Sequence, residues 1–213
     1  MNHTTSIRTR TLIPLTLTFL VLLLSFLFSS FAIRQANVSE TLNRAYGDTI
    51  SIYKELLFRR VEWMTAAAVP IINDPSLKRA MRQRDRGALY KNSLPFFQKL
   101  NTNNVTHFYF HDLDTKNFLR VHLPDRHSDI VQRDSLNRAI KFGTPAYGTE
   151  VGPFGTLTLR LVIPWKDQKG SLGFIELGTD VSDILSDVAI IHNIDYLITI
   201  NNAVYNTSLE AQK

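Results

Sequence analysis

The chain begins with a hydrophobic run that no charged residue interrupts. The 23 residues from Thr11 to Ile33 include no Asp, Glu, Lys or Arg. As a helix this run spans roughly 34 Å, enough to cross a hydrocarbon core of about 30 Å. Arg8 and Arg10 precede it without an acidic residue, a bias that favours a cytoplasmic N-terminus. The pattern predicts cytoplasmic residues 1–10 and a transmembrane helix at 11–33.

A cleaved signal peptide is the competing interpretation of the same run. Ser30-Phe31-Ala32 offers small residues at the spacing of a cleavage site. The apolar region is longer than the usual signal core of about 7–15 residues, which favours an uncleaved anchor. In either case we expect the residues after it to lie outside the cytoplasm.

A helical stripe follows the apolar run. Its apolar residues recur at intervals of three and four: Leu42, Tyr46, Ile50, Tyr53, Leu57, Val61, Met64 and Ala68. This spacing predicts a long helix that ends or kinks before Pro70. The stripe can pack on its own domain or pair with a second copy of the chain, and both can hold over different turns.

The pattern then changes from helical to alternating. A second helical region is expected from about Leu77 to Leu100, interrupted near Asp85 to Gly87. Beyond Asn101, β-branched and aromatic residues indicate strands. The expected strands are Val105–His111, Phe118–Leu123, Ala146–Val151, Thr156–Pro164 and Ser171–Gly178, with short helices at Ser135–Phe142 and Asp180–Ile191 and a final apolar run at Asp195–Ile200.

Helices first and a mostly antiparallel sheet afterwards predict an α+β fold. We expect an extracytoplasmic helical region at 34–101 and a sheet domain at 102–200. Residues 201–213 are then a polar tail or the start of a further region.

Composition and charge narrow the function. A hydrophobic content of 44% is ordinary for a globular protein. Without Arg8 and Arg10, 22 basic residues face 19 acidic ones, a balance too mild to indicate nucleic-acid binding. The chain contains no cysteine, which excludes disulfides, thiolate catalysis and cysteine-bound zinc. The basic run from Lys78 to Lys91 is most simply a solvated helix face, and an anionic ligand or a lipid headgroup is the alternative.

Catalytic and metal-binding patterns are weak. His107 and His111 share a strand face but stand about 13 Å apart, too far to bind one metal ion. No acidic third ligand accompanies His122, so we expect neither a metal site nor a haem. No nucleophile elbow, phosphate loop or dinucleotide-binding motif occurs. The sequence therefore predicts a chain that is not an enzyme and has no cofactor.

Binding is the chemistry that the spacing permits. His107, Tyr109 and His111 share one face of a strand, and Phe118, Arg120 and His122 share a face of the next. In a hairpin these side chains can line one surface, whose guanidinium, imidazole and phenol groups suit a ligand with a carboxylate. For Arg120 and His122 an exposed strand face or an internal brace is the alternative.

Two charged residues interrupt apolar strands. Arg160 lies between Leu159 and Leu161, and Glu176 lies between Ile175 and Leu177. A buried charge requires a partner. Either these two residues pair and brace the sheet, or they meet a ligand.

Several of these motifs together resemble the extracellular Cache sensor domains of bacteria. They are the Phe-Leu-Arg-Val-His-x-Pro strand from Phe118, the turn Val151-Gly-Pro-Phe-Gly155 before Leu159-Arg160, and Gly173-Phe-Ile-Glu-Leu-Gly178. The similarity covers about Ala36 to Ile200 and is nearest to the double-Cache type of chemoreceptors, sensor histidine kinases and diguanylate cyclases. It implies a PAS-like antiparallel sheet on a long N-terminal helix.

The resemblance also implies a ligand pocket between the sheet and its inserted loops. Carried onto this sequence, the pocket candidates are Tyr109, Arg120, His122, Arg133, Glu150 and Arg160. Proteins of this kind continue into an output module, which would follow Lys213, and we expect one Cache lobe before it.

The function expected from these observations is that of a single-pass sensor domain in a bacterial inner membrane. Its domain outside the cytoplasm would bind a small organic ligand, and the N-terminal helix would pass on the signal. We expect Arg120→Ala to abolish ligand-induced stabilisation and to leave the fold intact. The alternative is a membrane-anchored protein-protein interaction module without a small-molecule ligand, whose basic helix from Lys78 to Lys91 docks a protein or an anionic surface. Such a module can form a homodimer through its long helix.

Overall fold

The computed structural model describes residues 7–152 and 155–202. The chain divides into two units, residues 1–51 and residues 52–213. Helix α1 (Ile7–Asn73) begins in the first unit and ends in the second. In the first unit its large apolar side chains are exposed, among them Leu22 at 69% and Phe28 at 75%. Among the described residues, this helix is the one segment long and apolar enough to cross a membrane.

Helix α1 continues through Pro70, where the sequence predicted an end or a kink, and ends at Asn73. Proline in a helix interior costs about 3 kcal/mol because it removes one backbone hydrogen bond. Here Ala68 and Ile71, on either side of Pro70, are fully buried in the core of the second unit. This burial offsets the cost and keeps the last turn helical.

Aspartates begin the next two helices. Asp74 accepts hydrogen bonds from the backbone nitrogens of Ser76 and Leu77 and caps α2 (Pro75–Arg82). Asp85 accepts one from Ala88 and caps α3 (Arg86–Asn101). Each carboxylate satisfies amide groups that have no partner inside the helix. The predicted interruption near Asp85 is therefore a helix boundary.

Five strands form one sheet in the order β2-β1-β5-β4-β3, and every neighbouring pair is antiparallel. The strands are β1 (Val105–His111), β2 (Asn117–Arg120), β3 (Ala146–Val151), β4 (Leu157–Asp167) and β5 (Gly170–Asp180). Helix α4 (Asp134–Phe142) precedes β3, and α5 (Val181–His192) follows β5. The α+β fold expected from the sequence is confirmed.

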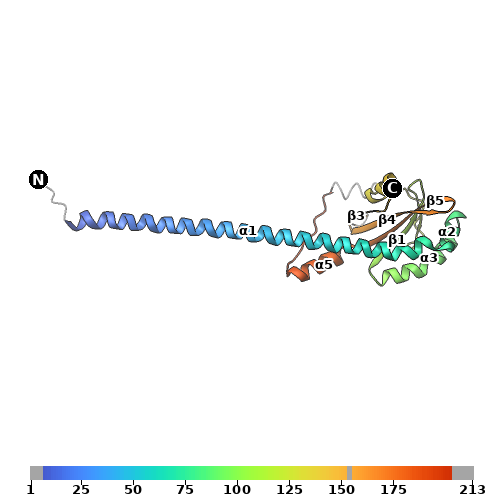
Figure 1. Ribbon diagram of the computed structural model, residues 1–213, viewed down its shortest axis with the longest axis horizontal. Coiled ribbons are helices and arrows are strands. Elements are labelled where there is room, and N and C mark those ends of the chain that lie inside the picture. The colour runs from blue at the N-terminus through green and yellow to red at the C-terminus, as the bar shows by residue number, and fades with distance from the viewer. Residues whose placement is uncertain (1–6, 153–154, 203–213) are drawn as a thin grey trace. The chain divides into compact units, whose positions relative to one another are not determined.

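The two faces of the sheet differ in composition. Helices α1 and α3 cover the helix-side face (Figure 1), where the strand residues are apolar: Phe108, Phe110, Leu119, Leu159, Leu161, Ile163, Trp165, Ile175 and Leu177. The alternate positions form the polar face, defined here by His107, Tyr109, His111, Arg120, Arg160 and Glu176. Successive strand residues point to opposite sides, so the same strands supply both faces.

A small second core covers part of the polar face. Helix α4 packs against β3 and β4, and Leu136 and Ala139 of α4 join Val162 and Phe174 of the sheet in a separate buried cluster. The helix ends at Gly143, whose φ of +65° is left-handed and favours glycine. Helix α4 and the segment before it thus bring their side chains close to the polar face.

Candidate functional site

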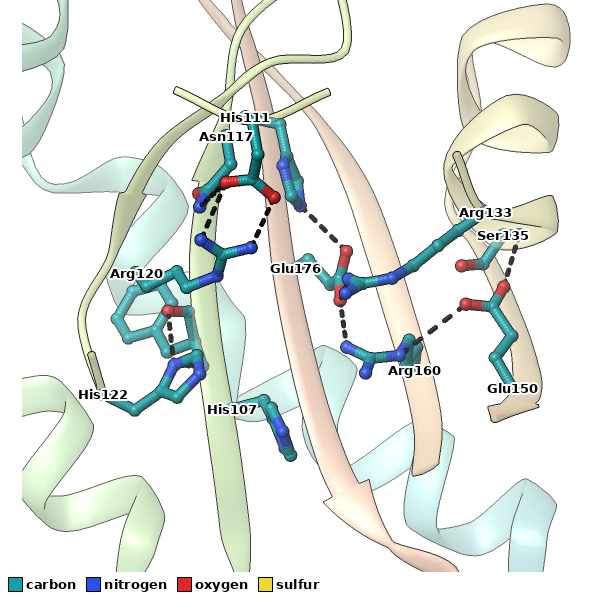
Figure 2. Close-up of polar contacts among 12 residues, drawn as sticks. His107, His111, Asn117, Arg120, His122, Arg133, Ser135, Glu150, Arg160 and Glu176 are labelled. Carbon is teal, nitrogen blue, oxygen red and sulfur yellow. Dashed lines mark hydrogen bonds and ion pairs between the residues drawn. The ribbon is translucent and has the colours of Figure 1, made fainter. Parts of the chain in front are cut away.

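Glu176 lies at the centre of the polar face and is fully buried. Its Oε1 accepts hydrogen bonds of 2.5 Å from Arg133 and 2.5 Å from Arg160, and its Oε2 lies 2.8 Å from His111 Nε2 (Figure 2). Burial raises the pKa of this carboxyl, but the guanidinium groups of Arg133 and Arg160 outweigh burial and hold the pKa well below its usual 4.5. Glu176 is therefore an ionised carboxylate that three elements share.

Arg160 and Glu176 form the pair that the sequence suggested as one alternative. Arg160 is 1% exposed, and its charge stays in place because Glu176 compensates for its burial. Its Nε lies 3.6 Å from Glu150 Oε2, a contact too long for a hydrogen bond. In the sheet Arg160 stands opposite Gly178 and Gly148, neither of which has a side chain to cover it.

Arg133 and Glu150 join helix α4 to the sheet. Arg133 occupies the N-cap position of α4, and its side chain reaches across to Glu176 instead of capping the helix. Glu150 of β3 accepts a 2.8 Å hydrogen bond from the backbone nitrogen of Ser135, in the first turn of α4. A negative charge at that position also suits the helix dipole. The start of α4 is therefore held by two charged contacts.

Arg120 lies on β2, at the edge of the polar face furthest from β3, and it contacts the loop that follows β2. It makes a bidentate ion pair with Asp129, with hydrogen bonds of 2.8 and 2.6 Å, and it donates a third to the backbone oxygen of Arg126. Burial raises the pKa of the Asp129 carboxyl, but the hydrogen bond from Arg120 outweighs it and lowers the pKa. Arg120 thus braces the loop that connects β2 to α4, the internal role weighed as an alternative.

His122, Tyr109 and His107 form an aromatic group. The ring centroid of His122 lies 4.7 Å from that of Tyr109 and 4.9 Å from that of His107. The His122 Nδ1 atom lies 3.2 Å from the backbone nitrogen and oxygen of Phe108. Burial lowers the pKa of His107 to about 3 and that of His122 to about 4. Both imidazoles are therefore neutral at pH 7.

Tyr109 is the residue on which the cluster converges. It stands opposite Arg120 on one side and Glu176 on the other. The guanidinium carbons of Arg133, Arg120 and Arg160 lie 5.1, 5.5 and 5.8 Å from the centre of its ring. These distances are within the range of cation–π attraction. All six predicted pocket residues thus belong to one connected group, which is what the sequence could not show.

Phe118 is the exception to the predicted grouping. A register irregularity between β1 and β2 at Phe110 and His111 makes a bulge, and a bulge turns a side chain toward a different surface. Phe118 therefore lies in the core of the helix-side face, and the guanidinium of Arg84 lies 4.2 Å from its ring centre. The expectation that Phe118 shares a face with Arg120 and His122 was wrong.

Sequence reasoning missed two partners. Asp129, which pairs with Arg120, lies in a loop without periodicity, and only its position nine residues after Arg120 could have suggested it. His111 was considered as a metal ligand, whereas it contacts Glu176. Within the described residues no group of three or more His, Asp or Glu side chains is placed to hold a metal. In the predicted turn before Arg160, Pro153 and Phe154 lie outside the described residues.

Comparison with known families agrees with this architecture. Residues 35–212 match the family described as the double sensory domain of two-component sensor kinase, dCache_3. The chain belongs to the dCache_3 family. No curated protein sequence matches this dCache_3 chain.

Three solved protein domains share the fold of this dCache_3 chain. The sensor domain of Escherichia coli DcuS is 14% identical with a TM-score of 0.52, and the match covers 65% of this chain and 98% of that one. The Vibrio cholerae histidine kinase DctB sensor domain is 15% identical with a TM-score of 0.52 and coverages of 69% and 59%. A domain of a putative sensory box/GGDEF protein from Vibrio parahaemolyticus is 12% identical with a TM-score of 0.52 and coverages of 66% and 60%. The chain thus spans about three-fifths of the latter two.

Proposed function

We propose that this chain is a membrane-anchored sensor domain outside the cytoplasm of a bacterium. Its polar face binds a small organic ligand with a carboxylate group, and helix α1 passes the signal through the inner membrane. The chain itself has no catalytic step in this proposal. The observation that carries the proposal is the convergence of Arg120, Arg133 and Arg160 on Tyr109.

Energetics supports a binding role for this convergence. A buried ion-pair network is often no more stable than apolar residues of the same volume. The helix-side face shows that these strands can carry apolar residues at most of their buried positions. Charged groups kept in a buried cluster are candidates for function. Arg160 and Glu176, at 1% and 0% exposure, therefore favour a role in recognition.

The chemistry of the cluster favours a carboxylate. A guanidinium can form paired hydrogen bonds with a carboxylate, and Arg133 and Arg160 each already donate one hydrogen bond to Glu176 Oε1. Neutral His107 and His122 and the ring of Tyr109 offer an uncharged aromatic wall beside these charges. A ligand carboxylate would take the place of Glu176 on Arg133, whose side chain is the more exposed of the two at 13%.

Membrane anchoring rests on the first unit. The apolar side chains of α1 between Leu12 and Ile33 are exposed around the whole helix, which is unfavourable in water and favourable in hydrocarbon. A single apolar helix near an N-terminus is also typical of a signal sequence. We favour the anchor because the uncharged run is long enough to span a bilayer.

Signal transfer requires two arrangements of the domain with different ligand affinity. The ligand can bias α1 only by that difference, typically about 1–3 kcal/mol. Arg133 and Glu150 tie α4 to the sheet, so exchange of Glu176 for a ligand carboxylate would change a contact between two elements. We propose that this exchange is the structural change that is transmitted to α1.

The test is thermal unfolding of the full chain in detergent with a panel of carboxylates and amino acids. We expect at least one compound to raise the unfolding temperature of the wild type and to lose this effect in Arg133→Gln. Arg126→Gln, an exposed arginine in the same loop, is the matched control and should keep it. If no compound stabilises the wild type, or Arg133→Gln responds fully, the proposal fails.

Arg120→Ala is a less informative test of ligand binding than the sequence suggested. Its removal leaves Asp129 half-buried without its bidentate partner. We now expect this variant to lose stability, which would obscure the loss of ligand binding. Arg133 avoids this problem in part because Arg160 and His111 still contact Glu176.

A further inference from the structure

A groove lies between helix α2 and the turn that joins β4 to β5, away from the polar face. Its volume is about 700 Å³, and its lining includes Lys78, Arg79 and Arg82 of α2 and Asp167 and Lys169 of the turn. Both walls belong to the second unit. The groove is open to solvent, and basic side chains line both of its walls.

The walls of the groove are fixed by the domain itself. Leu77 and Met81 bury the inner side of α2 in the main core. Arg82 makes two hydrogen bonds to the Asp167 carboxylate, of 2.5 and 3.3 Å, and so joins α2 to the turn. Asp167 also accepts a 2.7 Å hydrogen bond from the Lys169 backbone nitrogen, which fixes the turn. A partner would therefore meet a preformed surface.

The basic run of the sequence divides into two groups in three dimensions. Arg84 forms an ion pair with Asp112, and Arg86 donates to the backbone oxygen of Phe118. By contrast, Lys78 and Arg79 form no ion pair with an acidic side chain of the described residues. Lys169, 90 residues further along the chain than Arg79, faces the same groove and is equally unpaired within the part that the structure describes.

We propose that this groove docks an acidic segment of a partner polypeptide. Lys78, Arg79 and Lys169, which form no salt bridge within the described residues, stand on two walls beside the Arg82–Asp167 ion pair. The groove therefore keeps an excess of positive charge, and an occupant with several separated anionic groups fits it. Small ligands usually bind in enclosed sites that bury most of their surface, which this open groove cannot do. An extended acidic segment can contact both walls and continue beyond them. The amide side chains of Gln83 and Gln168 line the same groove and can hydrogen-bond its peptide groups.

The expected binding is electrostatic. Exposed cations give fast association and an affinity that falls steeply as salt rises, since charges further apart than about 8–10 Å are screened at physiological ionic strength. This proposal does not depend on a ligand at the polar face, because the two sets of residues share no member.

The test is fluorescence anisotropy with a labelled hexaglutamate peptide and the full chain in neutral detergent at low salt. The double variant Arg79→Glu with Lys169→Glu should bind about tenfold or more weakly than the wild type. Both side chains are exposed, so the unfolding temperature should change little. The matched control is Lys99→Glu with Lys141→Glu, which makes the same change of net charge at exposed positions outside the groove.

The outcomes separate the alternatives. An equal loss of peptide affinity in the control variant would overturn the proposal, because it would show a general effect of net charge. Absence of peptide binding by the wild type would also overturn it. Citrate or inorganic phosphate that competes at the peptide's own concentration would assign the groove to free anions. Displacement of the peptide by the soluble lipid headgroup glycerol phosphate, but not by inorganic phosphate, would assign it to a lipid surface. Selective loss in Arg79→Glu with Lys169→Glu, without such competition, supports it.

Discussion

The two faces of the sheet are made by the same strands and have opposite energetics. On the helix-side face, Phe108, Leu161 and Trp165 pack against α1 and α3 without polar partners other than the indole nitrogen, which donates to the Ile72 backbone oxygen. One residue away along each strand, Tyr109 and Arg160 belong to a network of buried charges. A shift of one position thus changes apolar packing into charge pairing.

This difference suggests a division of roles. Burial of apolar surface contributes about 25 cal/mol per Å², whereas a buried ion pair gains little after desolvation. The helix-side face therefore holds the domain together, and the polar face is held in shape by it. The predictions below test this division, from the largest expected effect to the smallest.

The largest effect is expected on the helix-side face. Trp165→Ala removes a fully buried indole and should lower the free energy of unfolding by about 3–5 kcal/mol. The measurement is urea denaturation of the full chain in detergent, followed by circular dichroism. Phe142→Ala, at a position that is 61% exposed, is the control and should cost less than about 1 kcal/mol. Similar losses for both variants would contradict the assigned core.

Removal of the central carboxylate should cost slightly less. Glu176→Gln leaves Arg133 and Arg160 without their shared negative charge, and breaking a buried pair in this way costs about 3 kcal/mol. The free energy of unfolding is again the measured quantity. Glu62→Gln, on the exposed side of α1, is the control.

The same variant should change the acid response. The wild-type pKa of Glu176 is lowered, so its contribution is complete above its usual pKa of 4.5 and is lost as pH falls below it. Glu176→Gln should lose less stability than the wild type between pH 4.5 and pH 3. An identical acid response would show that Glu176 is not a charged partner.

The half-buried residues His107 and His122 should add a dependence of stability on pH in a higher pH range. Their pKa values are lowered from 6.5 to about 3 for His107 and about 4 for His122. The unfolded chain therefore binds more protons, and stability falls as pH drops below 6.5. Each histidine should contribute about 2 kcal/mol or less of this loss by pH 5.

His122→Phe should flatten the change between pH 6.5 and pH 5. The measured quantity is the free energy of unfolding from urea denaturation at a series of pH values. Leu123→Ala, at an exposed position in the neighbouring loop, should leave the slope as in the wild type. A slope unchanged by His122→Phe would show that this imidazole is not buried.

The smallest effect concerns two buried threonines. Thr179 donates a 2.6 Å hydrogen bond to the Asn104 backbone oxygen, whereas the Thr158 hydroxyl makes no hydrogen bond with a described residue. Thr179→Val should cost about 1–2 kcal/mol, and Thr158→Val should stay within about 0.5 kcal/mol of the wild type. Thermal unfolding of both variants checks this difference, and the reverse order would contradict it.

Much of the fold follows from local pattern. Strands Val105–His111 and Ala146–Val151 have the ends expected from their alternation, because a strand with one apolar face has a period of two. The limits of such reasoning are visible at Pro70, where burial outweighs a local preference. They are visible again at Phe118, where a bulge changes the face of a side chain.

The sequence predicted which residues belong to the candidate site, but it did not predict which of them contact one another. An ion pair between Arg160 and Glu176 could be suggested because each of these charged residues interrupts an apolar strand. By contrast, Arg133 contacts Glu176, which lies 43 positions further along the chain, and Asp129 lies in a loop whose path no periodicity determines. Such contacts depend on how α4 and its preceding loop fold over the sheet, which sequence spacing does not encode. The ligand-binding role of these residues stays a prediction.

The most direct test of the sensor proposal is hydrogen–deuterium exchange of the full chain with a stabilising carboxylate. We expect slower exchange in β1, β2 and the segment that leads from Val131 into α4, and little change in α2 and the β4–β5 turn. The same compound should leave Arg133→Gln unprotected. Protection confined to α2 and the turn, or none in β1 and α4, would show that the polar face is not where the ligand binds.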